Sequence, residues 1–122
     1  MGIRPLIMYN FDVMDIKALT QAMHQFVRDK GWYQPDSLRP QTPKNLAISL
    51  NLEAAEILEL YQWTDNAPDP KLLASELADV TLYLLQLASI SEIDLEQAVL
   101  EKLRFNTNRK WDQALQENKD QQ

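Results

Sequence analysis

The scarcity of glycine constrains the fold of this chain more than any other feature of its sequence. Glycine occurs only at positions 2 and 31 among 122 residues. Two glycines are too few for a turn-rich β fold or for a glycine-rich phosphate-binding loop. Hydrophobic residues make up 45% of the chain, and a chain of this length suits one domain with a real core. We therefore expect a single all-α domain over residues 1–122, with its core at about 13–111.

Apolar spacing and capping residues divide this core into four helices. Gly31 suits the left-handed residue that follows a helix, and three prolines make the segment after it a loop. Thr42 and Asp69 each precede a proline, as an N-cap precedes the first helical residue, and Asp94 is expected to cap the last helix. The helices are predicted over residues 13–31, 43–63, 70–90 and 95–111. Short connections between them favour a four-helix bundle, and the polar residues 112–122 are expected to form a tail without a helix.

Composition and charge exclude several classes of protein. The absence of cysteine rules out disulfides and thiolate metal sites and is compatible with a cytoplasmic location. The first ten residues do not resemble a signal peptide, and the richest apolar run, Val80 to Ile90, is too short to span a membrane. The net charge is −6 and no basic stripe occurs, so a nucleic-acid polymer is not an expected partner. We expect a soluble protein with no membrane partner.

Two acidic pairs lie on consecutive predicted helices, and both border apolar stripes. Glu53 and Glu56 are three residues apart on the second helix, as Glu76 and Asp79 are on the third. If the two helices pack antiparallel, Glu56 and Glu76 both lie roughly 10 Å from the connection, at about 1.5 Å per residue. The four carboxylates are therefore expected to converge.

Converging carboxylates favour a bound metal ion over a solvated helix face. Two charges about 4 Å apart repel by roughly 4 kcal/mol at an effective dielectric near 20. Such a group must take up protons or a cation. Oxygen ligands without histidine favour Mg²⁺, or Mn²⁺, over zinc, and the absence of a Glu-x-x-His motif disfavours a di-iron bundle. One Glu-x-x-Glu pair alone is usually a solvated face, but two pairs bordered by leucine favour a function.

Cations, amides and aromatic residues provide further candidates. Lys102, Asn106 and Arg109 share one stripe of the fourth helix, which suits a polyphosphate but also a helix C-terminus whose dipole attracts cations. Trp32 and Trp63 follow helix ends, where each ring either fills the core or stacks on a nucleobase. His24, the only histidine, is expected at the surface or the edge of the core without a partner for nucleophilic chemistry.

Three segments resemble those of the MazG-like all-α nucleoside triphosphate pyrophosphohydrolases, especially the branch with dCTP pyrophosphatase. They are TPKNLAISLNLEAAEILELYQW, ELADVTLYLL and KLRFNTNR. The resemblance covers about residues 15–111. It implies Mg²⁺ ligands and substrate-binding residues at particular positions. The implied metal ligands are Glu53, Glu56, Glu76 and Asp79, and the implied substrate-binding residues are Trp32, Lys44, Trp63, Tyr83, Lys102, Asn106 and Arg109.

The resemblance also implies a reaction and an assembly. The reaction is hydrolysis of a deoxynucleoside triphosphate, dCTP or a modified nucleotide, to the monophosphate and pyrophosphate, with Glu53 or Glu56 acting on the attacking water. The assembly is a homodimer or homotetramer whose sites borrow residues from a neighbour. Gln41 departs from the pattern, because relatives commonly carry histidine there. The alternative is a non-catalytic helical interaction module in which the acids hold a structural metal.

Overall fold

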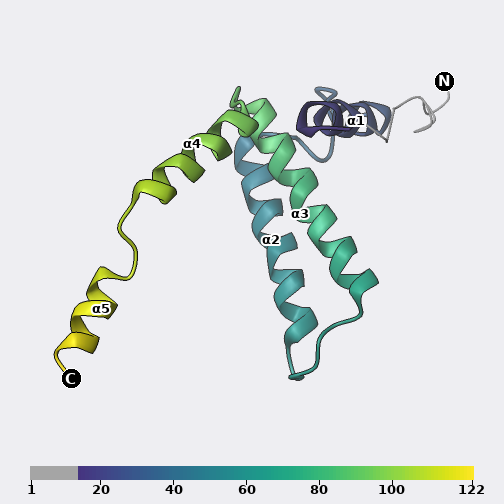
Figure 1. Ribbon diagram of the computed structural model, residues 1–122. Helices are drawn as coiled ribbons and strands as arrows, with labels where there is room; N and C mark the ends of the chain where they lie inside the picture. Colours follow the sequence, from purple (N-terminus) through teal and green to yellow (C-terminus); the bar gives the residue numbers. More distant parts are fainter. Residues whose placement is uncertain (1–13) are drawn as a thin grey trace.

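The computed structural model describes residues 14–122 and contains only helices in that range (Figure 1). The helices are α1 (Ile16–Asp29), α2 (Pro43–Tyr61), α3 (Pro70–Ile90), α4 (Leu95–Asn108) and α5 (Gln113–Asp120). The predicted all-α fold is confirmed. Val13, the expected start of the first helix, lies outside the described residues.

The predicted caps set the starts of the central helices. Thr42 accepts a hydrogen bond from the backbone N–H of Asn45 at 3.2 Å, and Asp69 accepts one from that of Lys71 at 2.9 Å. Each cap satisfies an amide that has no partner within the helix. Gly31 has a φ of 75°, as expected of the residue that ends a helix in the left-handed region. The observed bounds of α3 coincide with the predicted range 70–90.

The end of α2 comes two residues earlier than predicted. The helix stops at Tyr61, because Gln62 adopts an extended ψ of 137° and Trp63 a left-handed φ of 68°. The resulting turn reverses the chain into α3, so α2 and α3 form the antiparallel pair at the centre of the structure (Figure 1).

The core lies at one end of this pair, where α1 packs on α3. Its buried apolar residues come from three helices: Met23, Val27, Leu46, Leu85 and Ala88. Elsewhere the α2–α3 pair leaves large apolar side chains in solvent, such as Leu58, which is 72% exposed. A single chain therefore covers only part of the apolar surface that its sequence provides.

Helix α4 begins beside the end of α3 and is directed away from the α2–α3 pair (Figure 1). It ends at Asn108, earlier than the predicted Trp111, whose indole Nε1 donates to the carbonyl of Asn106 at 2.7 Å. The guanidinium of Arg109 lies over the indole ring, 4.2 Å from its centroid. Trp111 thus packs against the end of α4.

The prediction of a tail without a helix was wrong, because α5 covers most of residues 112–122. Glutamine, alanine, leucine, glutamate and lysine all have high helix propensity, which does not require an apolar stripe. The side chain of Gln116 also donates to Asp120, four residues later, at 2.9 Å. A helix that is polar on most sides forms here from local preferences.

By length and composition, α3 is the one helix among residues 14–122 that could span a membrane. The sequence analysis expected no span, because its richest apolar run, Val80 to Ile90, has only eleven residues. Core helices of soluble proteins meet the same criterion, so the observation is weak evidence for a membrane. Only 17% of its most apolar stretch is buried in the single chain.

Candidate metal centre and adjoining pocket

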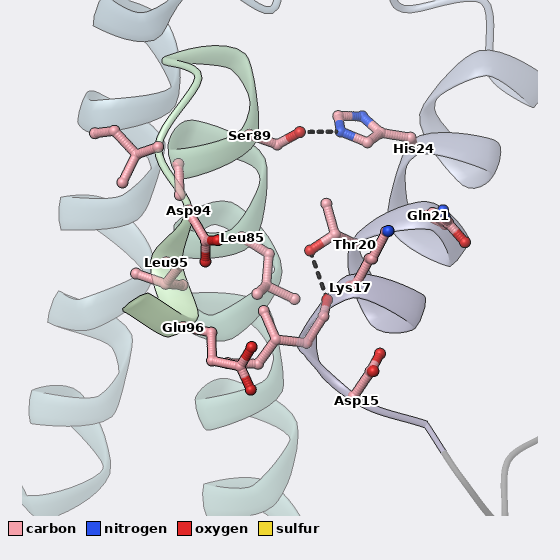
Figure 2. A pocket seen from close by; sticks show the side chains of 13 residues that line it. Asp15, Lys17, Thr20, Gln21, His24, Leu85, Ser89, Asp94, Leu95 and Glu96 are labelled. Carbon is pink, nitrogen blue, oxygen red and sulfur yellow. Dashed lines mark hydrogen bonds between the residues drawn. The ribbon is translucent and has the colours of Figure 1, made fainter. Parts of the chain in front are cut away.

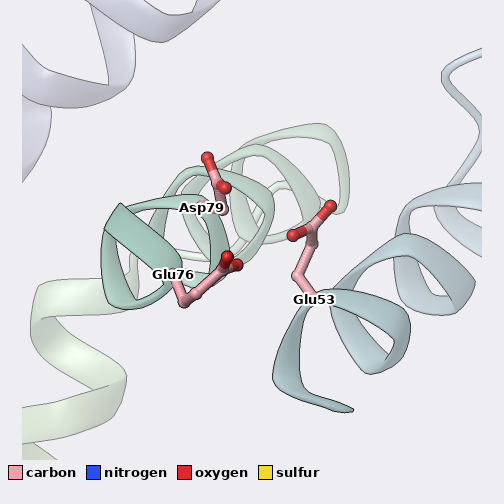
Figure 3. Close-up of side chains that lie close together, drawn as sticks. All are labelled: Glu53, Glu76 and Asp79. Carbon is pink, nitrogen blue, oxygen red and sulfur yellow. The ribbon is translucent and has the colours of Figure 1, made fainter. Parts of the chain in front are cut away.

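Three of the four predicted metal ligands meet between α2 and α3. Glu53 extends from α2, and Glu76 and Asp79 extend from α3 toward it (Figure 3). One carboxylate oxygen from each lies within 4.8 Å of the other two. The antiparallel pairing of α2 and α3 thus brings together the acids of separate helices, as their spacing from the connection predicted.

Two oxygens of this cluster are buried without a partner. Oε2 of Glu53 and Oε2 of Glu76 are shielded from solvent, and neither accepts a hydrogen bond. Burial is the main cause that raises the pKa of Glu53, followed by the charge of Glu56, a hydrogen bond with Glu56 and the charge of Asp79. The folded chain therefore resists full ionisation of these acids.

The fourth acid, Glu56, is exposed and lies outside the group of three. It still interacts with both other glutamates of the cluster. A hydrogen bond with Glu56 is the largest cause that raises the pKa of Glu76, ahead of burial and the charges of Glu56, Asp79 and Glu53. The pKa of neither Glu53 nor Glu76 is lowered by a lysine or an arginine.

The donor set of the cluster fits a hard divalent cation. Its ligand atoms are carboxylate oxygens, and no histidine joins the group among residues 14–122. Oxygen ligands are those that Mg²⁺ prefers in proteins. The two buried oxygens without partners are the groups that a cation would satisfy. The arrangement is thus suited to Mg²⁺ or Mn²⁺ and unsuited to zinc.

A pocket of about 280 Å³ adjoins the acids toward the start of α2. It is lined by Trp32 and by residues that include Gln41 and Asn45. Ser49 and Tyr83 also line it, and each is four residues from an acid of the cluster, Glu53 and Asp79 respectively. Four residues are about one helical turn, so the pocket lies one turn from the acids on both helices.

Trp32 and Trp63 do not meet within one chain. Trp32 packs edge-on against Phe26, at 5.6 Å between ring centroids, and faces the pocket near the start of α2. Trp63 follows the opposite end of α2 and is 93% exposed. α2 has 19 residues, so its ends lie roughly 28 Å apart at about 1.5 Å per residue. One chain therefore cannot place both rings on the same base.

The predicted phosphate-binding residues also lie apart from the acids. Lys102, Asn106 and Arg109 belong to the second half and the C-cap of α4, which points away from the α2–α3 pair (Figure 1). Lys102 lies over the ring of Phe105, with Nζ 5.4 Å from the centroid. Lys44 is exposed in the first turn of α2, next to Asn45 in the pocket wall.

His24 has partners that the sequence did not indicate. Its Nε2 lies 2.7 Å from Oγ of Ser89, and its Nδ1 lies 2.5 Å from the hydroxyl of Tyr33. Figure 2 shows the contact with Ser89 in the wall of a second pocket, of about 510 Å³, between α1 and the start of α4. No local pattern could indicate the contact with Ser89, since 65 residues separate it from His24.

Gln86 is the other polar residue that the sequence analysis missed. It is only 3% exposed and is the one buried polar side chain among the described residues. A signal was present, because it is the only amide in the apolar run from Val80 to Ile90. A buried amide needs hydrogen-bond partners, which such a run cannot supply. Its partners come from residues before α2.

Comparison with known proteins connects this arrangement to pyrophosphatases. The chain is 36% identical to dCTP pyrophosphatase 1 of Homo sapiens over 94 residues, which are 70% of this chain and 52% of that protein. The Mus musculus protein of the same name is 35% identical over equal shares. This chain thus spans about half the length of the curated relatives it matches.

A solved structure matches more completely. The crystal structure of a pyrophosphatase from Archaeoglobus fulgidus superposes with a TM-score of 0.65 at 32% sequence identity. The match covers 80% of this chain and 94% of that chain. No protein-family model matches the sequence.

Proposed function

Because this chain belongs to the MazG-like family of all-α nucleoside triphosphate pyrophosphohydrolases, we propose that it hydrolyses a deoxynucleoside triphosphate to the monophosphate and pyrophosphate. The observation that carries the proposal is the acidic cluster with two buried, unpartnered oxygens, one helical turn from an aromatic-lined pocket. The proposed substrate is dCTP or a modified deoxynucleotide, in keeping with the names of the curated relatives.

In this proposal Glu53, Glu56, Glu76 and Asp79 hold Mg²⁺, with Mn²⁺ as a possible substitute. The bound ion would supply neutralisation of phosphate charge and a water of lowered pKa. Glu56 is the best placed of the four to orient or deprotonate the attacking water, because it is exposed whereas Oε2 of Glu53 is buried. Attack at the α-phosphorus breaks its bond to the bridging oxygen, and pyrophosphate leaves.

The pocket beside the acids is proposed to hold the base. The ring of Trp32 would stack on it, an interaction worth about 1–3 kcal/mol for a base on an aromatic side chain. Tyr83 and Asn45 line the same pocket, and Tyr83 is four residues from Asp79 on α3. Lys44, in the exposed first turn of α2, would approach the phosphates from the pocket rim.

A second copy of the chain is proposed to complete the site. Lys102, Asn106 and Arg109 are phosphate-binding residues in this proposal, and α4 carries them away from the acids of their own chain (Figure 1). Trp63 lies at the far end of α2 from Trp32. Homodimers or homotetramers would also cover the exposed apolar side chains of α2 and α3. The deoxynucleotide pool makes the cytoplasm the proposed location.

The test is pyrophosphate release from each of the common deoxynucleoside triphosphates, with Mg²⁺ and with a chelator. We expect Mg²⁺-dependent release that is reduced at least about a hundredfold in Glu56→Gln and Asp79→Asn, a typical loss for removal of a catalytic or metal-binding group. Glu117→Gln, an exposed change on α5, is the control and should retain activity. An inert wild type that Mg²⁺ stabilises against heat would instead support an interaction module with a structural metal.

A further inference from the structure

Five polar side chains form a continuous hydrogen-bonded chain behind the Trp32 pocket, called here the Gln86 network. Its members in order are Gln41, Gln86, Tyr33, His24 and Ser89. Nε2 of Gln86 donates to Oε1 of Gln41 at 2.8 Å and to the hydroxyl of Tyr33 at 3.2 Å. His24 links Tyr33 to Ser89 through its two ring nitrogens. The network connects the pocket beside the acids to the pocket drawn in Figure 2.

One backbone carbonyl fixes the orientation of the two glutamine amides in the network. Nε2 of Gln41 lies 2.6 Å from the carbonyl oxygen of Arg39, which can only accept. The opposite end of the Gln41 amide, Oε1, must therefore face Gln86 and accept from its Nε2. Tyr33 accepts from the same nitrogen and is free to donate its own proton to Nδ1 of His24.

A proton donated by Tyr33 to Nδ1 would leave His24 neutral with its own proton on Nε2, directed at Oγ of Ser89. Burial lowers the pKa of His24, and the charge of Arg28 lowers it further, in agreement with a neutral ring. A histidine that donates to a serine cannot remove the proton of that serine. The network ends at Ser89.

The other end of the network, Gln41, lies in the wall of the proposed base pocket. A free glutamine side chain exchanges its oxygen and nitrogen by a half-turn at little energetic cost, because the two are nearly the same size. Gln41 cannot do so without placing Oε1 against the Arg39 carbonyl and Nε2 against the Gln86 amide nitrogen. The second N–H of its Nε2 and the free lone pair of its Oε1 therefore keep fixed positions relative to each other and to the pocket.

We propose that Gln86 sets the base selectivity of this site by holding the Gln41 amide in one orientation. A 4-amino pyrimidine offers an acceptor at N3 and a donor at N4, whereas a 4-oxo pyrimidine offers a donor at N3 and an acceptor at O4. A Gln41 amide held in one orientation can pair with only one of these two arrangements of donor and acceptor. Against the other arrangement, polar groups of the amide and the base stay unpaired. This inference rests on the proposed function, whose proposed substrate dCTP belongs to the 4-amino class.

The experiment measures kcat and KM for dCTP and dTTP in the wild type, in Gln86→Met and in the control Gln21→Met, which removes an exposed amide from α1. In Gln86→Met we expect the preference for dCTP over dTTP, as a ratio of kcat/KM, to fall about tenfold, the size of one well-placed hydrogen bond. The change should lie in KM, with kcat for dCTP within about twofold of wild type. An unchanged ratio in a folded Gln86→Met protein overturns the inference.

Binding of the products dCMP and dTMP, followed by calorimetry, keeps this test separate from the proposed function. Selective binding of dCMP that Gln86→Met abolishes supports the inference even if no triphosphate is hydrolysed. Hydrolysis by the wild type without any preference between the two pyrimidines overturns the inference and leaves the proposed function intact. Equal binding of both products by the wild type overturns it as well.

A second variant covers the case in which Gln86→Met does not fold. Gln41→Met removes the amide at the pocket wall and should reduce the dCTP preference by the same factor. Where both variants fold, the double variant should lose no more selectivity than either single one, because both remove the same oriented amide. Losses that multiply in the double variant would show that the two residues act separately.

Discussion

Glu53 and Glu76 each hold a buried carboxylate oxygen that accepts no hydrogen bond, so their charge should destabilise the metal-free chain. The pKa of each is raised in the folded state, which therefore binds more protons than the unfolded state above the ordinary value of 4.5. The free energy of unfolding from these groups falls as pH rises through that window. A cation that binds the folded state should restore it at neutral pH.

The first prediction concerns Glu53→Gln at pH 7. Without metal, this variant should melt a few degrees above the wild type, since an uncharged amide replaces a carboxylate whose ionisation the fold disfavours. With Mg²⁺ the order should reverse, because the wild type alone keeps the full ligand set. Thermal melting with and without Mg²⁺ measures both effects. A metal-free Glu53→Gln that melts below the wild type would contradict the destabilising role of the charge.

A second prediction concerns the pKa of His24, which burial and then Arg28 lower below 6.5. The unfolded chain binds this proton at a higher pH than the folded chain does, so the contribution of His24 to stability is lost as pH falls below 6.5. Because His24 is the only histidine, its ring resonance in a proton NMR titration is unambiguous. The midpoint should lie below 6.5.

Arg28→Gln provides the control for that titration. It should move the midpoint upward by only part of the shift, because burial is the larger cause and remains. A wild-type midpoint at or above 6.5 would mean that the ring is more solvated, or its hydrogen bonds differently directed, than the structure shows.

At the scale of single helices, the sequence predicts where a helix begins if its capping residue directly precedes it in the chain. Asp69 and Pro70 defined the start of α3 from the sequence, and Thr42 and Pro43 defined that of α2. The end of α2 was not predictable, because it depends on Trp63 taking a left-handed φ that the sequence does not demand. The Gln86 network was also out of reach, since its members come from three distant segments.

The third prediction tests the cap of α3. Asp69→Ala removes the side-chain acceptor of the Lys71 N–H and should lower the free energy of unfolding by about 1 kcal/mol. Asp69→Asn keeps an oxygen at the cap and should remain within a few tenths of a kcal/mol of the wild type. Urea denaturation measures both. Equal losses in the two variants would show that the charge of Asp69, rather than its capping oxygen, matters.

At the scale of the whole molecule, the acid spacing predicted which helices face each other but not where α4 points. α2 and α3 pack antiparallel on either side of the connection 62–69, so Glu53, Glu76 and Asp79 converge within one chain. The connection before α4, residues 91–94, is shorter still, yet α4 makes few contacts with the α2–α3 pair (Figure 1). Its orientation fits an assembly in which it packs on another copy.

The last prediction tests whether active sites combine residues of two chains, as proposed above. Asp79→Asn and Arg109→Gln should each be inactive alone, one lacking a metal ligand and the other a phosphate ligand. If α4 serves the acids of a partner, a mixed dimer has one site with both defects and one intact site. Random mixing in equal amounts then restores about a quarter of wild-type sites, because half of the dimers are mixed.

The matched control for this mixing experiment is Asp79→Asn with Glu76→Gln. Both residues belong to the same cluster of one chain, so every site in the mixture carries one defect and no activity should return. Pyrophosphate release after co-refolding measures both mixtures, and size-exclusion chromatography of differently tagged chains establishes that they exchange. Recovery absent from both mixtures, despite exchange, would mean that α4 folds back onto its own chain. Recovery in the first mixture alone requires that α4 cross between copies.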